Sequence, residues 1–138
     1  MPECVLRVIG RDFDPKVAPL GTTTPHGVFV RGEPVRQSSK RVNETSGITW
    51  VVSESSDDLA KQVEGAISFL RVHARDIARI VAMPGVDEAY LDFGYTFRIG
   101  GGVAVQVDCL PVELVTLAAT VPLGIMLSLY PSPESDRP

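Results

Sequence analysis

The chain has 138 residues, of which 44% are hydrophobic and 22% charged, and its formal net charge is −4. This length suits one domain, and the acidic balance argues against nonspecific binding to nucleic acid or to an anionic membrane. No apolar segment approaches the roughly 20 residues of a membrane span, and the N-terminus lacks the basic and apolar regions of a signal peptide. A cytoplasmic protein with neither nucleic-acid nor membrane partners is therefore expected.

A strand and a short helix are predicted near the N-terminus. The apolar run at residues 4–9 suits a strand. Asp14 then offers a helix cap and Pro15 a first-turn residue, which together predict a short helix that ends before Gly21. The segment 21–47 is rich in Gly, Pro, Ser and Thr, and it predicts a long loop that contains at most a short edge strand.

The middle of the chain predicts a strand followed by a long amphipathic helix. Ile48, Trp50 and Val52 alternate with more polar residues, as in a half-buried strand. The only tryptophan is expected to anchor the core, with a partner for its indole N–H. Apolar residues then recur every three or four positions over 59–81, as on one face of a helix. This pattern leaves open whether residues 57–83 form one helix or two.

The last third predicts a hairpin, a helix and a final strand. Alternation is strongest at residues 89–99, and three glycines separate this run from a second alternating run at 103–107. Pro111 is expected to open another helix, and a last strand is expected at 125–130. The proline-rich end, 131–138, is predicted to be a disordered tail.

Residues 48–130 therefore carry the order strand, helix, strand, strand, helix, strand. This order predicts an α+β two-layer sandwich with a ferredoxin-like βαββαβ core, in which both helices cover one face of the sheet. The strand at 4–9 and the short helix would be additions to this core, with the strand at an edge or over the sheet. Residues 1–130 are expected to form a single domain.

A set of short motifs is distributed over residues 4–131. The motifs are Phe13-Asp14-Pro15, Arg31-Gly32-Glu33, Thr49-Trp50, Leu110-Pro111-Val112-Glu113-Leu114 and Leu129-Tyr130. Together they resemble the bacterial domain of unknown function 4279 family. One departure is Ala18-Pro19-Leu20-Gly21, which shortens the first helix relative to the family pattern. The resemblance implies a fold and no activity, because the family has none assigned.

Few residues suggest chemistry. His26 is the best candidate, because a histidine beside the hydroxyls of the Thr-rich segment before it could act as a base for a nucleophile. No acid is placed by the sequence to orient its ring, so an exposed turn histidine is the stronger interpretation, and no catalytic residue is predicted. Cys4 and Cys109 are expected to be small buried side chains. No ligand spacing suits a metal, and no cofactor is predicted.

The strand phases place a mixed set of residues on the sheet face that the helices leave open. They are Val51, Tyr90, Asp92, Thr96, Arg98, Gln106, Met126 and Tyr130. Tyr, Met and Arg are enriched at interfaces. We therefore expect a non-enzymatic binding or protein-interaction module that self-associates through this face, with Arg98 pairing with Asp92 across a two-fold axis. The partner would be a second copy or another protein.

An alternative is a small-ligand-binding protein or an enzyme that uses the loop around His26. Asp92 and Asp108 could also share one sheet face as an acid/base or metal pair. The candidate ligand or interface residues are thus Tyr90, Asp92, Arg98, Tyr130 and His26. A deep pocket that reaches His26 would favour the ligand hypothesis, and a flat, paired sheet face would favour the interaction hypothesis.

Overall fold

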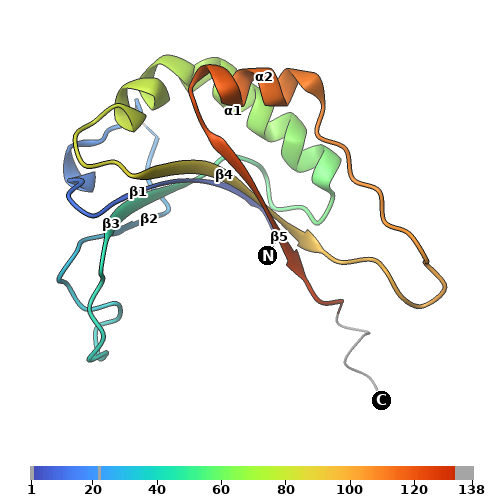
Figure 1. The fold of residues 1–138 in the computed structure, drawn as a ribbon, viewed down its shortest axis with the longest axis horizontal. Coiled ribbons are helices and arrows are strands. Elements are labelled where there is room, and N and C mark those ends of the chain that lie inside the picture. The colour runs from blue at the N-terminus through green and yellow to red at the C-terminus, as the bar shows by residue number, and fades with distance from the viewer. Residues whose placement is uncertain (1, 22, 133–138) are drawn as a thin grey trace.

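A computed structural model describes residues 2–21 and 23–132. Its two layers are a five-stranded sheet and a pair of α-helices that lie on one face of that sheet (Figure 1). The elements are β1 (Cys4–Gly10), a 3-10 turn (Pro15–Val17), β2 (Gly27–Phe29), β3 (Ser46–Val51), α1 (Leu59–Val81), β4 (Glu88–Thr96), α2 (Val112–Thr120) and β5 (Gly124–Tyr130). The predicted α+β class is confirmed. Neither helix in the described part of the chain combines the length and apolarity of a membrane span.

The strand order is β2-β3-β1-β4-β5, and it differs from the predicted ferredoxin-like arrangement. β1 is the central strand and pairs antiparallel with both β3 and β4, so that Leu6 lies between Trp50 and Leu91. The expected edge position of residues 4–9 was therefore wrong. The physical reason is visible in the strand itself, because Val5, Leu6 and Val8 are all buried and only a central strand buries both faces.

The second hairpin strand expected at 103–107 is absent from the described structure. β4 ends at Thr96, and residues 97–110 form an extended segment, called the arm below, that leaves the sheet and returns to α2 (Figure 1). The three glycines, 100–102, all have positive φ and turn the arm back on itself. β5 pairs in parallel with β4 and so occupies the edge that a hairpin strand would need. Val105 and Val107 are left exposed.

The core lies between the sheet and α1. Residues 59–81 form one helix, which settles the alternative of two. The side chain of Asp58 caps this helix by accepting a hydrogen bond of 2.9 Å from the Ala60 N–H. Trp50 is 1% exposed, as expected of a core anchor, but its indole N–H has no partner among the described residues. Gln62 is also fully buried, and its amide donates to the Gly94 carbonyl at 2.7 Å.

The remaining segments differ in detail from the expectations. The short N-terminal helix is only a 3-10 turn, with the Asp14 side chain accepting from the Lys16 N–H. The long loop carries hydrogen bonds of its own, such as Val35 N–H to the Arg41 carbonyl at 2.9 Å. The tail predicted at 131–138 lies mostly outside the described residues.

Candidate functional site

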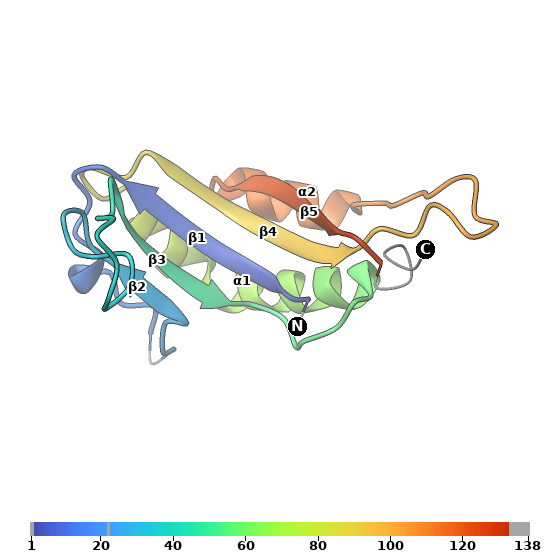
Figure 2. The ribbon, with the colours of Figure 1, turned by 90° about the horizontal axis from the view of Figure 1, so that it is seen from below.

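The sheet face opposite the helices is uncovered. Viewed from that side, β3, β1, β4 and β5 lie in front of both helices (Figure 2). The sheet curves so that the helices lie on its convex side and the open face is concave, with the loop 30–45 and the end of β5 descending on either side (Figure 1).

A hollow of about 250 Å³ lies on the open face where β1, β3 and β4 run side by side. The strand register brings its residues together, because Arg7 of β1 lies opposite Thr49 of β3 and Val5 lies opposite Asp92 of β4. His26, the residue before β2, is held beside β3 because its backbone N–H donates to the Thr49 carbonyl at 2.7 Å. The lining residues are Glu3, Val5, Arg7, His26, Thr49, Asp92, Gly94 and Tyr130.

Asp92 and Arg7 form the charged floor of the hollow. Asp92 is 8% exposed, and its Oδ1 accepts a hydrogen bond of 2.6 Å from the Ser128 hydroxyl. Its Oδ2 lies 3.6 Å from Nη2 of Arg7, which is a loose ion pair. Nε of Arg7 is buried and has no hydrogen-bond partner among the described residues. The Arg7 side chain is 43% exposed, so its terminal nitrogens retain donor capacity at the surface of the hollow.

Two tyrosines border this charged pair. The Tyr130 ring lies over Gly94, where an added Cβ would come 3.0 Å from Tyr130 Cε2, so the glycine makes room for the ring. Tyr90 lies opposite Arg7 in the register. Burial raises the pKa of Tyr90, and the charges of Asp92 and Glu88 add to this, whereas Arg7 opposes it. Tyr90 therefore keeps its proton at neutral pH and acts as a hydrogen-bonding group.

Three of the five candidate residues line the hollow, namely His26, Asp92 and Tyr130. Tyr90 shares the face without lining the hollow. The expected position of Arg98 on the open sheet face was wrong. The chain leaves the sheet after Thr96, so this residue lies in the arm.

Sequence reasoning missed Arg7, Glu3 and Thr49. The signal for Arg7 was present, since it is the only charge within the apolar run 4–9. A charge at the centre of such a run points to a strand buried on both faces that carries one functional or paired group. The residue was overlooked because this strand was expected to lie outside the core of the sheet.

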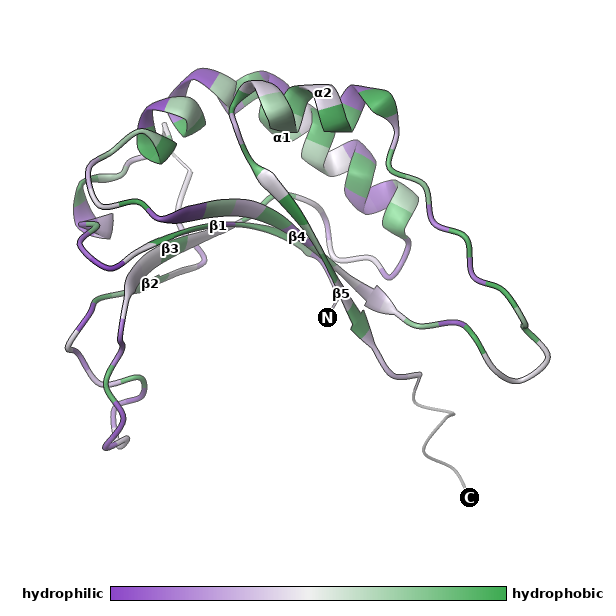
Figure 3. Ribbon diagram, in the orientation of Figure 1, coloured by the Kyte–Doolittle hydropathy of each residue, from purple (hydrophilic) through white to green (hydrophobic). Residues whose placement is uncertain are grey.

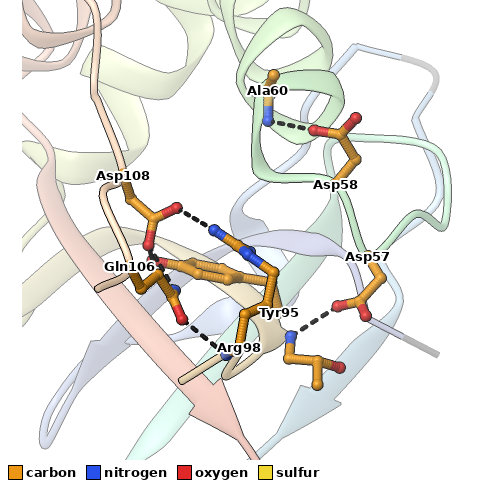
Figure 4. A network of polar contacts seen from close by, with 8 residues as sticks. Asp57, Asp58, Ala60, Tyr95, Arg98, Gln106 and Asp108 are labelled. Carbon is orange, nitrogen blue, oxygen red and sulfur yellow. Dashed lines mark hydrogen bonds and ion pairs between the residues drawn. The ribbon is translucent and has the colours of Figure 1, made fainter. Parts of the chain in front are cut away.

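Arg98 belongs to a separate polar network that fastens the arm to β4 (Figure 4). Asp108 is its centre and receives Arg98 Nη2 at 2.7 Å and the Tyr95 hydroxyl at 3.0 Å. The Gln106 amide also donates to Asp108 at 2.7 Å. This Gln106 bond, with help from Arg98 and Tyr95 and against the effect of burial, lowers the pKa of Asp108. Because Asp108 lies in the arm and not in a strand, it does not share a sheet face with Asp92.

A larger hollow of about 710 Å³ lies beside this network, near the start of α1. Its acids already have partners, since Asp57 accepts from the Thr96 N–H at 2.6 Å and Asp58 caps α1. Exposed Cys109 also borders it, contrary to the expectation of a buried side chain, because the arm carries this residue away from the core. These contacts hold the arm and the start of α1 against the end of β4, so we interpret this hollow as structural.

The histidine and the buried cysteine near the open face lack the partners of a catalytic group among the described residues. His26 is exposed, and no described carboxylate forms a hydrogen bond with its ring. Burial, followed by the charge of Asp92, raises the pKa of the Cys4 thiol, so this thiol stays protonated and unreactive. No group of three His, Cys, Asp or Glu side chains in residues 2–21 and 23–132 is placed to hold a metal ion.

Comparison with known proteins adds no relative from which a role could be transferred. No protein-family model, curated protein or solved structure matches the chain. The open-face hollow is therefore interpreted from its own geometry.

Proposed function

We propose that this protein is a non-enzymatic binding module that holds a small carboxylate ligand on the open face of its sheet. The observation that carries this proposal is the Arg7 guanidinium, which lines the hollow on a side chain that is 43% exposed and makes only a loose ion pair of 3.6 Å with Asp92. Its accessible terminal nitrogens can therefore donate hydrogen bonds to the oxygens of a ligand. A planar guanidinium is also the side chain best shaped to bind a carboxylate.

The surrounding groups define the kind of ligand. The hydroxyls of Thr49 and Tyr130 and the ring of His26 supply further polar contacts, and Glu3 at the rim is placed to accept an ammonium group. A volume of about 250 Å³ lies slightly below the range of drug-sized pockets. The ligand would thus be the size of an amino acid or a small dicarboxylate.

Self-association is the other part of the proposed function, but the open face suits it less well. Two concave faces related by a two-fold axis would touch at their rims and leave a void between them. Arg98, the expected bridge to Asp92 of a second copy, is already bound to Asp108. Asp92 in turn is bound to Arg7 and Ser128. The hollow borders His26, which supports the ligand hypothesis, although it is small and open rather than deep.

Membership of the domain of unknown function 4279 family, suggested by the short motifs, is part of the same proposal. It adds an expectation about the fold and none about activity.

The test is a titration of the isotope-labelled protein with succinate, followed by amide NMR shifts. We expect saturable shifts at β1, β3 and β4 around Arg7, and none with succinamide, which has the same shape without the charge. Arg7→Gln should abolish the response. Arg7→Lys, which keeps the charge but loses Nε and the planar fork, should weaken it. Arg36→Gln, an exposed arginine of the loop, is the matched control and should bind normally.

The proposal would be wrong if succinate, glycine and glutamate all left the spectrum unchanged at millimolar concentrations. It would also be wrong if Arg7→Gln responded like the unmodified protein, because the ligand would then lie elsewhere.

A further inference from the structure

β5 is one of the two edge strands of the sheet, and its outer edge has no partner strand among the described residues. β5 is a seven-residue edge strand, and its side chains Leu127 and Leu129 are 44% and 49% exposed. Glu113 is the only charged residue between positions 110 and 131. An exposed, apolar and uncharged edge strand is a ready template for pairing with another strand.

The backbone of this edge is oriented for pairing. The Tyr130 carbonyl accepts from the Phe97 N–H at 2.8 Å, so the backbone groups of Tyr130 point toward β4. Because backbone direction alternates along a strand, Gly124, Met126 and Ser128 point the same way, and Ile125, Leu127 and Leu129 direct their N–H and C=O groups to the free edge. Three residues on this edge thus present a donor and an acceptor each.

Helix α2 continues the same uncovered surface. Glu113 forms an ion pair with Arg71 of α1, which fixes the side of α2 that faces α1. At about 100° per residue, Val112, Val115 and Ala119 then lie on the opposite side, above the free edge of β5. Val112 is 81% and Val115 46% exposed. Hydrophilic positions are far fewer along α2 and β5 than along α1 (Figure 3). A helix that is apolar on its outer side as well as its inner side calls for a partner.

We propose that a second copy of this chain covers the surface, with β5 of each copy pairing antiparallel about a two-fold axis at Leu127. The two sheets would then join into one continuous sheet, with the two α2 helices packed across the axis. In this register Leu127 faces Leu127 and Ile125 faces Leu129, and both are hydrogen-bonded pairs. All seven residues of β5 find partners. A shift of two residues would leave the ends of each strand unpaired.

The other side of the same strand fits this register. On the open face, Gly124 of one copy would lie opposite Tyr130 of the other, and Met126 opposite Ser128. The Tyr130 ring lies over Gly94 of β4, so it leaves the space beside the free edge clear. The strand thus has the self-complementarity that a two-fold interface requires.

Charge and size also favour a second copy. Antiparallel pairing brings no two like charges together, because β5 carries none. The strand is about 23 Å long, and the strip spans both the sheet and the helix layer. A strip of this size is typical of the smaller specific interfaces, so a reversible dimer is expected.

Disulfide trapping tests both the surface and the register. In a Cys109→Ser background, Leu127→Cys should cross-link to itself under mild oxidation, because a hydrogen-bonded antiparallel pair has Cα atoms about 5.5 Å apart, within disulfide reach. Leu129→Cys is the matched control and should not cross-link, since its two copies would be about 14 Å apart. Sedimentation velocity should show the unmodified protein as a dimer at high micromolar concentration.

Charge insertion gives a second readout. Leu127→Arg should be monomeric, because it places two like charges at the axis, whereas Val72→Arg on the exposed side of α1 should remain dimeric. A monomeric unmodified protein at high micromolar concentration would overturn the proposal. So would a dimer in which Leu129→Cys cross-links and Leu127→Cys does not, or a Leu127→Arg variant that folds and still dimerises.

Discussion

The two edges of the sheet are protected to very different degrees. β2 has only three residues and passes at once into the loop 30–45, which carries charged residues of both signs. β5 has seven residues and no charge. Short strands and charges are the usual means by which proteins prevent unwanted strand pairing. The contrast indicates that the β2 edge is closed to partners and that the β5 edge is left open to one.

The lengths of the two helices explain why side chains of β1 and β3 are more buried than those of β5. α1 has 23 residues and is about 35 Å long, whereas α2 has nine and is about 14 Å long. α1 therefore covers the sheet along its length, and Trp50 and Leu6 beneath that layer are buried. α2 covers only part of β5, which leaves Leu127 and Leu129 half exposed.

The largest expected effect tests this difference in burial. Trp50→Ala should lower the free energy of unfolding by about 3–5 kcal/mol, because a large side chain is removed from a closed core. Leu129→Ala, on β5, should cost less than about 1 kcal/mol when measured on the monomer. Urea denaturation at low protein concentration measures both. Equal losses would show that the core extends under β5 as fully as under β3.

A pair of proline substitutions tests the backbone direction of the open edge. Met126→Pro removes an N–H that points toward β4, and Leu127→Pro removes one that points outward. Met126→Pro should therefore be about 1–3 kcal/mol less stable than Leu127→Pro as a monomer. Leu127→Pro should nevertheless prevent dimerisation. The reverse order of stability, measured by urea denaturation, would show that the inferred direction is wrong.

The smallest effect concerns the arm beyond this edge. Because hydrogen bonds lower the pKa of Asp108 in the folded state, its contribution to stability is present above the unfolded value of about 3.9 and is lost as the pH falls through the folded value. Asp108→Asn should therefore lower the melting temperature slightly at neutral pH. The difference from the unmodified protein should shrink as the pH falls below about 4. A difference that is constant with pH would exclude the carboxylate as its source.

The sequence was sufficient for elements with strong local periodicity. α1 was predictable because apolar residues recur along its whole length, and β4 because its alternation is regular. The same alternation at 103–107 was misleading, since side-chain spacing alone does not say whether a sheet edge is available. That edge is taken by β5, which depends on a helix crossover and not on local pattern.

The candidate site was predictable only in part, because local side-chain spacing does not determine which strands are neighbours. The strand phases placed Asp92 and Tyr130 on the open face, since side-chain direction alternates within a strand. Arg7 was missed and Arg98 wrongly included, because each depended on which strands lie next to each other. Strand neighbours are set by long-range pairing, which a single sequence does not reveal.

The central position of β1 has a consequence for how the chain folds. Cys4 pairs with Phe93, so β1 completes its pairing only when the chain as far as β4 is present. Closing so long a loop is entropically costly, and contacts of this kind slow folding. α1 can form early because its hydrogen bonds are local. β1 has no hydrogen-bonded neighbours until β3 and β4 pair with its two edges. Until β4 is present, the edge of β1 that will pair with it is open to unwanted strand pairing.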